Sequence, residues 1–254
     1  MKNRLWEMTW EEVKEAVEVS NGIIIIPVGS TEQHGRHLPL GTDTMVAISL
    51  ADEASKRTDT VMAPPVWTGW SPHHMVLPGT ITIRPQILIE LLFDIISSLS
   101  KHGFARFIVI NGHRIVNIPW MQIAAQSAQE KLGVKVKLFD PAYMSKEIVK
   151  GLGWGLIGHG EEIETSHMMV IHPDLVYEEK MVDAPQKETP LYWVDPRVEF
   201  DTLCYVPSTL EIMKEHAEKS GGISGKTKGA SYDKGKRYHE HLIKRLIEVI
   251  KGLK

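Results

Sequence analysis

The segment GIIIIPVG, residues 22–29, decides the fold class of this chain. Its four consecutive isoleucines are β-branched and favour an extended strand, and the flanking glycines limit its length. No polar residue alternates with them, which is typical of a strand that is buried on both faces. ARFIVIN, residues 105–111, is a second run of this kind. Such runs predict a mostly parallel sheet between layers of helices.

Helical and strand patterns alternate along the rest of the chain. Thr9 is the expected N-cap of the first helix, and helices are predicted over residues 9–19, 44–56, 85–102, 119–132 and 232–251. Two further short strands are predicted over residues 61–66 and 134–140. Prolines should end the first of them early, and the second should lie nearer an edge of the sheet. Residues 168–171 form a strand or a helix, and residues 183–220 should wrap the surface or an oligomer interface. The predicted fold class is α/β, a sandwich around a mostly parallel sheet.

The composition limits the possible partners and metal ligands. The chain has 254 residues, 29 basic and 32 acidic, and a net charge of −3, which argues against nucleic acid and anionic membranes as partners. It begins without the apolar stretch of a secretory signal, and its most apolar segment, residues 86–99, carries Glu90 and Asp94, so we expect a soluble cytoplasmic protein. Twelve histidines stand against one cysteine, Cys204, so any metal must be held by nitrogen and oxygen.

The first polar cluster directly follows the isoleucine strand, in STEQHGRHLPLGTDT, residues 30–44. Glu32 and His34 leave the same face of an extended segment, and the bend at Pro-Leu-Gly can fold Asp43 back toward them. Carboxylate and imidazole together suit zinc, manganese or iron. The alternative is a polar loop whose side chains are satisfied by hydrogen bonds.

Two further clusters carry the same kinds of side chain. NGHRIVN, residues 111–117, places His113 after the second apolar strand, where it would line a crevice or simply complete a turn. WGLIGHGEEIETSHMM, residues 154–169, crowds His159, Glu161, Glu162 and Glu164 together, as ligands of a cation or as the solvated start of a helix. If each cluster follows a strand, all three meet at the carboxyl edge of the sheet. Together they predict two divalent ions that share a bridging carboxylate and support metal-assisted hydrolysis.

These segments resemble the creatininase (creatinine amidohydrolase) family over nearly the whole chain. The resemblance rests on five ordered matches: PVGSTEQHGRHLPLGTD, SPHHMVLPGTITI, NGHRIVN, HGEEIETS and GISGKTKGASYDKGKRY. It implies a three-layer α/β/α sandwich formed by a single creatininase-like domain over residues 1–254. It also implies a site for two ions of zinc, manganese or iron, a small-molecule substrate, and a homo-oligomer, often a hexamer.

The resemblance also assigns metal ligands. Glu32, His34, Asp43 and His113 match metal ligands of the family, with Asp43 as the bridge. The fifth ligand of creatininase is the glutamate of its NGHYEN segment, and Ile115 stands at that position here. Members with an HAGE segment carry a glutamate at the position of Glu162, which is therefore the expected fifth ligand. Glu161, which replaces the usual glycine, is the alternative.

Further roles follow from the same resemblance. His159 matches a histidine that transfers protons, and Glu164 should orient His159 or the metal ligands. Trp154 resembles a tryptophan that covers the substrate, although it could equally be a packed aromatic side chain. His74 is expected to line the pocket. Arg114, where the family often has Gly or Tyr, could bind an anionic or polyhydroxylated substrate or lie at the surface.

The sequence therefore favours a metal-dependent hydrolase of the amidohydrolase type, in which a metal-bound hydroxide attacks the carbonyl of a small polar cyclic or amide substrate. One alternative is a carbon–carbon hydrolase of inositol catabolism that opens a cyclic diketone, similar to 3-dehydro-scyllo-inosose hydrolase. An alternative of another class is a non-catalytic, metal-containing binding or maturation factor. A serine or cysteine nucleophile is disfavoured, because no G-x-S-x-G elbow is present and Cys204 lies in an apolar context.

Overall fold

A four-stranded parallel sheet forms the centre of the computed structural model, which describes residues 2–155, 157–184 and 209–254. The strands lie in the order β2-β1-β3-β4. Their bounds are Val61–Met62 for β2, Ile23–Val28 for β1, Arg106–Asn111 for β3 and Lys135–Phe139 for β4. The sequence prediction of a parallel sheet is confirmed, including the early end of β2 and the edge position of β4.

Burial of β1 on both faces follows from its isoleucine run. All six residues of this strand are buried. Ile23 and Ile25 point into one hydrophobic cluster, while Ile24 and Ile26 point into a second cluster on the opposite face. A strand with this pattern is stable only in a sheet whose two faces are both covered. β1 therefore requires a layer of helices on each side.

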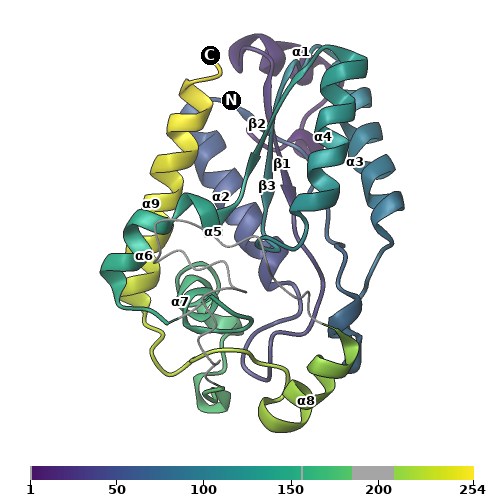
Figure 1. Ribbon diagram of the computed structural model, residues 1–254. Helices are drawn as coiled ribbons and strands as arrows, with labels where there is room; N and C mark the ends of the chain where they lie inside the picture. The colour runs from purple at the N-terminus through teal and green to yellow at the C-terminus, as the bar shows by residue number, and fades with distance from the viewer. Residues whose placement is uncertain (1, 156, 185–208) are drawn as a thin grey trace.

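The two helical layers meet that requirement (Figure 1). The cluster around Ile24 contains side chains of α1 (Trp10–Val19), α3 (Pro85–Ser100) and α4 (Ile118–Leu132). The cluster around Ile23 contains side chains of α2 (Thr42–Thr58) and α9 (Tyr232–Lys251). The architecture is therefore a three-layer α/β/α sandwich, as the sequence predicted. No helix within the described residues is both long and apolar enough to span a membrane.

Smaller elements gather beyond one end of the sheet, away from the two termini (Figure 1). The α-helices of this group are α5 (Pro141–Met144), α6 (Lys146–Leu152), α7 (Glu162–Ile171) and α8 (Leu210–Ser220). The short 3-10 helices of the chain are η1 (Leu5–Glu7), η2 (Pro72–Val76), η3 (Pro173–Leu175) and η4 (Glu178–Lys180).

The structure corrects one sequence prediction and limits another. Residues 168–171 are the last turn of α7, which is the helical one of the two predicted alternatives. We expected the polar cluster of residues 154–169 to follow a strand, and this is wrong, because the element before it is α6. Of the cluster's glutamates, Glu161 satisfies free N–H groups at the helix start, those of Ile163 and Glu164. The predicted surface segment, residues 183–220, is described only in part. Residues 209–220 are mostly α8, and residues 185–208, including Cys204, lie outside the described residues.

A close contact between β3 and α2 positions the functional residues. Gly112, directly after β3, lies against the backbone of Asp43 at the start of α2, and a Cβ at this glycine would collide with the Asp43 carbonyl oxygen. The contact between Gly112 and Asp43 holds the carboxyl end of the sheet next to the helix that carries Asp43.

The N-terminus of α1 is as the sequence predicted. Thr9 is its N-cap and forms a capping box with Glu12.

Candidate metal centre

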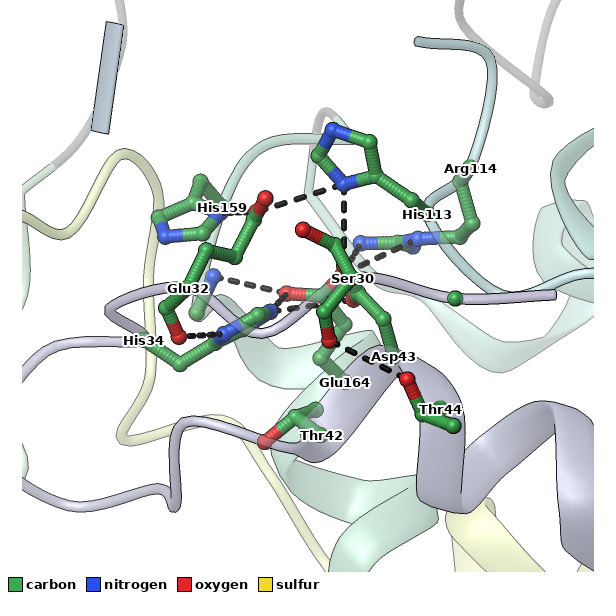
Figure 2. A network of polar contacts seen from close by, with 12 residues as sticks. Ser30, Glu32, His34, Thr42, Asp43, Thr44, His113, Arg114, His159 and Glu164 are labelled. Atoms are coloured by element: carbon green, nitrogen blue, oxygen red, sulfur yellow. Dashed lines mark hydrogen bonds and ion pairs between the residues drawn. The ribbon is translucent and has the colours of Figure 1, made fainter. Parts of the chain in front are cut away.

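Five acidic and histidine side chains meet beyond the carboxyl ends of β1 and β3 (Figure 2). Glu32 and His34 belong to the loop after β1, Asp43 to the first turn of α2, His113 to the loop after β3, and Glu164 to the first turn of α7. All five are buried. The sheet thus brings together side chains that are far apart in the sequence, as expected for a parallel α/β fold.

Asp43 lies at the centre of this cluster. Its Oδ1 is 3.1 Å from His34 Nε2, and its Oδ2 is 2.9 Å from His113 Nδ1. Glu164 Oε2 lies 3.7 Å from His34 Nε2, and Glu32 Oε1 lies 3.2 Å from His113 Nδ1. Two potential ligand groups, Glu32–Asp43–His113 and His34–Asp43–Glu164, share only Asp43, and a third, Glu32–His34–His159, takes one member from each of them.

The donor set fits divalent cations. Glu32 Oε1 is buried, lies within 3.2–3.6 Å of nitrogens of His113, His74 and His159, and has no hydrogen-bond partner in the described part of the chain. Buried polar atoms are normally paired, so this oxygen indicates that the protein side chains alone do not complete the site. His34 Nδ1 donates a hydrogen bond to the Glu32 carbonyl oxygen at 3.1 Å, which leaves Nε2 directed at Asp43 as a metal-binding atom.

The electrostatics of the cluster also call for positive charge. Burial opposes a charge on His34, yet Asp43 and Glu164 outweigh it and raise the pKa of His34 to about 9. Burial likewise opposes a charge on His113, but Glu32 and Asp43 raise its pKa well above the usual value. Without a metal, the two histidines would therefore carry the positive charge that balances the carboxylates. A bound cation can replace these protons.

Glu164 joins the cluster, whereas Glu162 does not. Glu162 Oε1 accepts a hydrogen bond from Gly155 N at 2.5 Å, and its carboxylate faces Gly229, so it forms none of the potential ligand groups. The two glutamates are two positions apart on α7 and point to different sides of the helix. Glu161, the alternative ligand, caps α7 by accepting from Ile163 N and Glu164 N. The structure thus places Glu164, and neither of the expected glutamates, beside His34 and Asp43.

Two more histidines face the cluster. The rings of His74 and His159 stack with centroids 4.0 Å apart, and the His34 ring is 4.4 Å from that of His159. His74 Nε2 and His159 Nδ1 lie 3.3 and 3.6 Å from Glu32 Oε1. Burial, reinforced by the charge of His34, lowers the pKa of His159 to about 4, so its imidazole is neutral near pH 7. Both histidines thus lie beside the cluster, and their expected roles as pocket residue and proton carrier stay predictions.

Arg114 and Trp154 both pack against other protein groups in this structure. The Arg114 guanidinium is buried between Glu161 and Glu164, and its charge, working against burial, lowers the pKa of Glu164 to about 2. Trp154 is 2% exposed and packs edge-on against Tyr238 of α9 at 5.4 Å. The expected roles of these two side chains in substrate binding stay predictions, and in the described structure the contacts of both are with protein groups.

Sequence reasoning missed two supporting residues. Ser71 Oγ donates to Glu32 Oε2 at 2.5 Å and so fixes this carboxylate. Asp140 accepts hydrogen bonds from Asn111 Nδ2 and from Ile115 N, both at 2.7 Å, and stabilises a loop in which Ile115 has a left-handed φ of 68°. Asp140 is the last residue of the predicted strand over residues 134–140 and directly follows β4 in the structure, so the rule that identified the other clusters applied to it as well.

Three known proteins show what this chain is similar to in sequence. 3-dehydro-scyllo-inosose hydrolase of Thermotoga maritima is 29% identical over 202 residues, 71% of this chain and 60% of that protein. Creatinine amidohydrolase of Pseudomonas putida is 28% identical over 235 residues, 85% of this chain and 89% of that protein. A mycofactocin precursor peptide peptidase of Mycolicibacterium smegmatis is 42% identical over 97 residues, 36% of this chain and 39% of that protein. The chain therefore matches only 60% of the length of the Thermotoga hydrolase and 39% of the length of the peptidase.

Solved structures and a family model complete the comparison. A crystal structure of creatinine amidohydrolase (creatininase) has a TM-score of 0.79 and 25% identity, and covers 97% of this chain and 96% of its own. A mutant creatininase of Zn–Zn type shares the fold with a TM-score of 0.81 at 24% identity, over 99% of this chain and 98% of its own. The creatininase family model, described as creatinine amidohydrolase, matches residues 6–250. With this match over nearly its whole length, the chain belongs to the creatininase family.

Proposed function

We propose that the protein is a metal-dependent hydrolase that cleaves a C–N bond at the carbonyl of a small polar cyclic or amide substrate, with two divalent ions in the site. The observation that carries this proposal is the position of Asp43, whose two oxygens face two separate groups of potential ligands. A carboxylate in this position can bridge two ions. Family membership supports the reaction class, since the relatives named above are hydrolases or a peptidase.

The proposed ligands are Glu32, Asp43 and His113 for one ion, and His34, Asp43 and Glu164 for the other. Zinc, manganese or iron would suit this nitrogen and oxygen set. Bound there, the ions would lower the pKa of a water molecule and polarise the carbonyl of the substrate. Ser71 and the Glu32 carbonyl oxygen hold Glu32 and His34 in the orientation that this requires.

His159 is the proposed proton carrier. Its Nε2 donates a hydrogen bond to the Gln33 carbonyl oxygen, which leaves the lone pair of Nδ1 directed toward Glu32. A neutral imidazole in this tautomer can take a proton at Nδ1 and pass it to the leaving group. Gln33 Nε2 donates to His74 Nδ1 at 2.9 Å, so the neighbouring His74 ring is also held in place.

The amide reaction is preferred over the carbon–carbon reaction because of Arg114. A polyhydroxylated ring was the ligand expected for this arginine, and its guanidinium instead pairs with Glu161 and Glu164. That contact leaves no structural argument for a polyol substrate. The non-catalytic alternative is disfavoured by a histidine, His159, whose Nδ1 faces the carboxylates and histidines of the cluster.

The test is a substrate panel on protein that has been stripped with a chelator and reloaded with zinc or manganese. Cyclic amides, linear amides, short peptides and a cyclic diketone would be compared at equal metal content. Turnover of a C–N substrate that depends on added metal is the expected result. Two bound ions with turnover of the diketone alone would replace the proposal by its carbon–carbon alternative. We also propose a homo-oligomer, a hexamer by family resemblance, which sedimentation measurements would test.

A further inference from the structure

A buried ion-pair network joins the loop after β3 to the start of α7 (Figure 2). Arg114 Nη2 lies 2.6 Å from Glu161 Oε1 and 2.6 Å from Glu164 Oε1, and Arg114 Nε donates to Glu164 Oε1 at 3.1 Å. The side chains of Arg114, Glu161 and Glu164 are 7%, 1% and 10% exposed. Charge-assisted hydrogen bonds of this length in a buried setting orient both partners strongly.

In both Glu161 and Glu164, the two carboxylate oxygens have different partners. Glu161 uses Oε2 to cap α7 and Oε1 to hold Arg114. Glu164 uses Oε1 for Arg114, while Oε2 accepts from Gly160 N at 2.7 Å and faces His34. The arginine therefore fixes one oxygen of Glu164 and directs the other toward the cluster of potential ligands. Both oxygens of Glu161 are directed to these partners, and Glu161 belongs to none of the potential ligand groups.

Arg114 is closed to a substrate on its remaining side. Its Nη1 is buried and has no partner within the described residues. The adjacent cavity, lined by Arg114, Asp43, Gly112, Glu164 and Tyr238 among others, measures about 10 Å³. That space holds roughly one water molecule. A substrate therefore cannot reach the guanidinium without displacing packed protein.

We propose that Arg114 is a positioning residue of the metal centre, which Glu161 holds against Glu164 so that Glu164 Oε2 faces His34 and Asp43. This inference rests on the proposed function, because it concerns the ligands of the second ion. A glutamate has several freely rotating bonds, and fixing it before the ion arrives removes that ordering cost from metal binding. Without the arginine, two buried carboxylates would stand side by side and repel each other.

The experiment compares metal affinity among Arg114→Met, Arg114→Lys and Glu161→Gln, measured by competition with a chromophoric chelator for zinc. Loss of a group that orients a metal ligand typically weakens affinity by about 10- to 100-fold. We expect that loss for one of the two ions in Arg114→Met, partial recovery in Arg114→Lys, and a smaller loss in Glu161→Gln. Arg4→Met is the control, because it also removes an arginine–carboxylate pair, here a partly exposed one with Asp52, which lies on α2 two turns beyond Asp43.

Circular dichroism and thermal melting would accompany every affinity measurement. Wild-type affinity for both ions in a folded Arg114→Met variant would overturn the inference. If Arg114→Met does not fold, Arg114→Lys decides in its place: weaker binding of one ion supports the inference, and wild-type affinity overturns it. Failure of the proposed function would appear differently, as a wild-type protein that binds no metal, and would remove the basis of this inference as well.

Discussion

Asp43 stands between His34 and His113, with one carboxylate oxygen 3.1 Å from His34 Nε2 and the other 2.9 Å from His113 Nδ1. Each oxygen therefore belongs to a different half of the site. Two independent sites would need separate carboxylates, whereas this arrangement makes both halves depend on one side chain. The position of that side chain is set by the close packing of Gly112 against the start of α2.

Replacement of the shared carboxylate should abolish binding of both ions. Asp43→Asn keeps the shape of the side chain but removes the charge and one metal-binding oxygen, so we expect neither ion to be retained after dialysis, as measured by elemental analysis. Asp52→Asn is the control, because Asp52 lies on the same helix and bonds to Arg4 and Lys56 instead. Retention of both ions by Asp43→Asn would contradict the bridging role.

The choice between two glutamates of α7 can be tested directly. Glu164→Gln should release one ion, because Glu164 Oε2 lies 3.7 Å from His34 Nε2. Glu162→Gln should retain both ions, because an amide oxygen can still accept the hydrogen bond from Gly155 N. Elemental analysis of the two variants checks this. The reverse pattern would restore Glu162 as the ligand.

Removal of the proposed proton carrier should separate catalysis from metal binding. His159→Gln deletes a group that can transfer a proton at Nδ1, and general acid–base catalysis contributes about 10²- to 10⁴-fold to a rate. We expect kcat to fall within that range while both ions remain bound. Steady-state kinetics and elemental analysis on the same sample provide the test. Loss of metal in this variant would make His159 a ligand instead.

Metal uptake should release protons near neutral pH. In metal-free protein the raised pKa values of His34, about 9, and of His113 keep both imidazoles protonated at pH 7, and each must lose its proton to bind a cation. Affinity should therefore rise as the pH increases toward 9. Calorimetric titration in two buffers with different ionisation enthalpies measures the protons directly. Identical heats in both buffers would contradict the prediction.

A methyl group at the contact between β3 and α2 should destabilise the fold. In Gly112→Ala the new Cβ would collide with the Asp43 carbonyl oxygen, and overpacking of this kind costs about 1–3 kcal/mol. Gly151→Ala is the matched control, because a Cβ on this residue of α6 meets no atom within 4 Å. The first variant should melt at a lower temperature than the wild type. The second should melt at an equal or higher temperature.

The sheet could be predicted from sequence because its strands are short apolar runs with clear limits. Four isoleucines between glycines leave β1 no other buried arrangement, and the prolines after β2 end it after two residues. Four of the expected ligands could be located from the sequence because of this sheet. Glu32, His34, Asp43 and His113 follow strands of one parallel sheet, so the topology alone brings them together.

The fifth potential ligand could not be predicted in this way. Glu162 and Glu164 are separated by about 200° around their helix, and the side that meets His34 depends on how α7 packs against α2 and α9. Arg114 raises the same difficulty, because its long side chain could equally turn toward a pocket or toward protein carboxylates. Both questions depend on contacts between segments that are distant in sequence, which local patterns do not encode.

The pairing of Arg114 with Glu161 makes the two positions unequal in what each needs from the other. Arg114 without Glu161 would still have Glu164 to neutralise the guanidinium. Glu161 without Arg114 would be a second buried carboxyl beside Glu164, and burial already raises the pKa of Glu161. A change at position 161 should therefore be tolerated while the arginine stays, whereas a change of the arginine should be better tolerated once the acid at position 161 has also been removed.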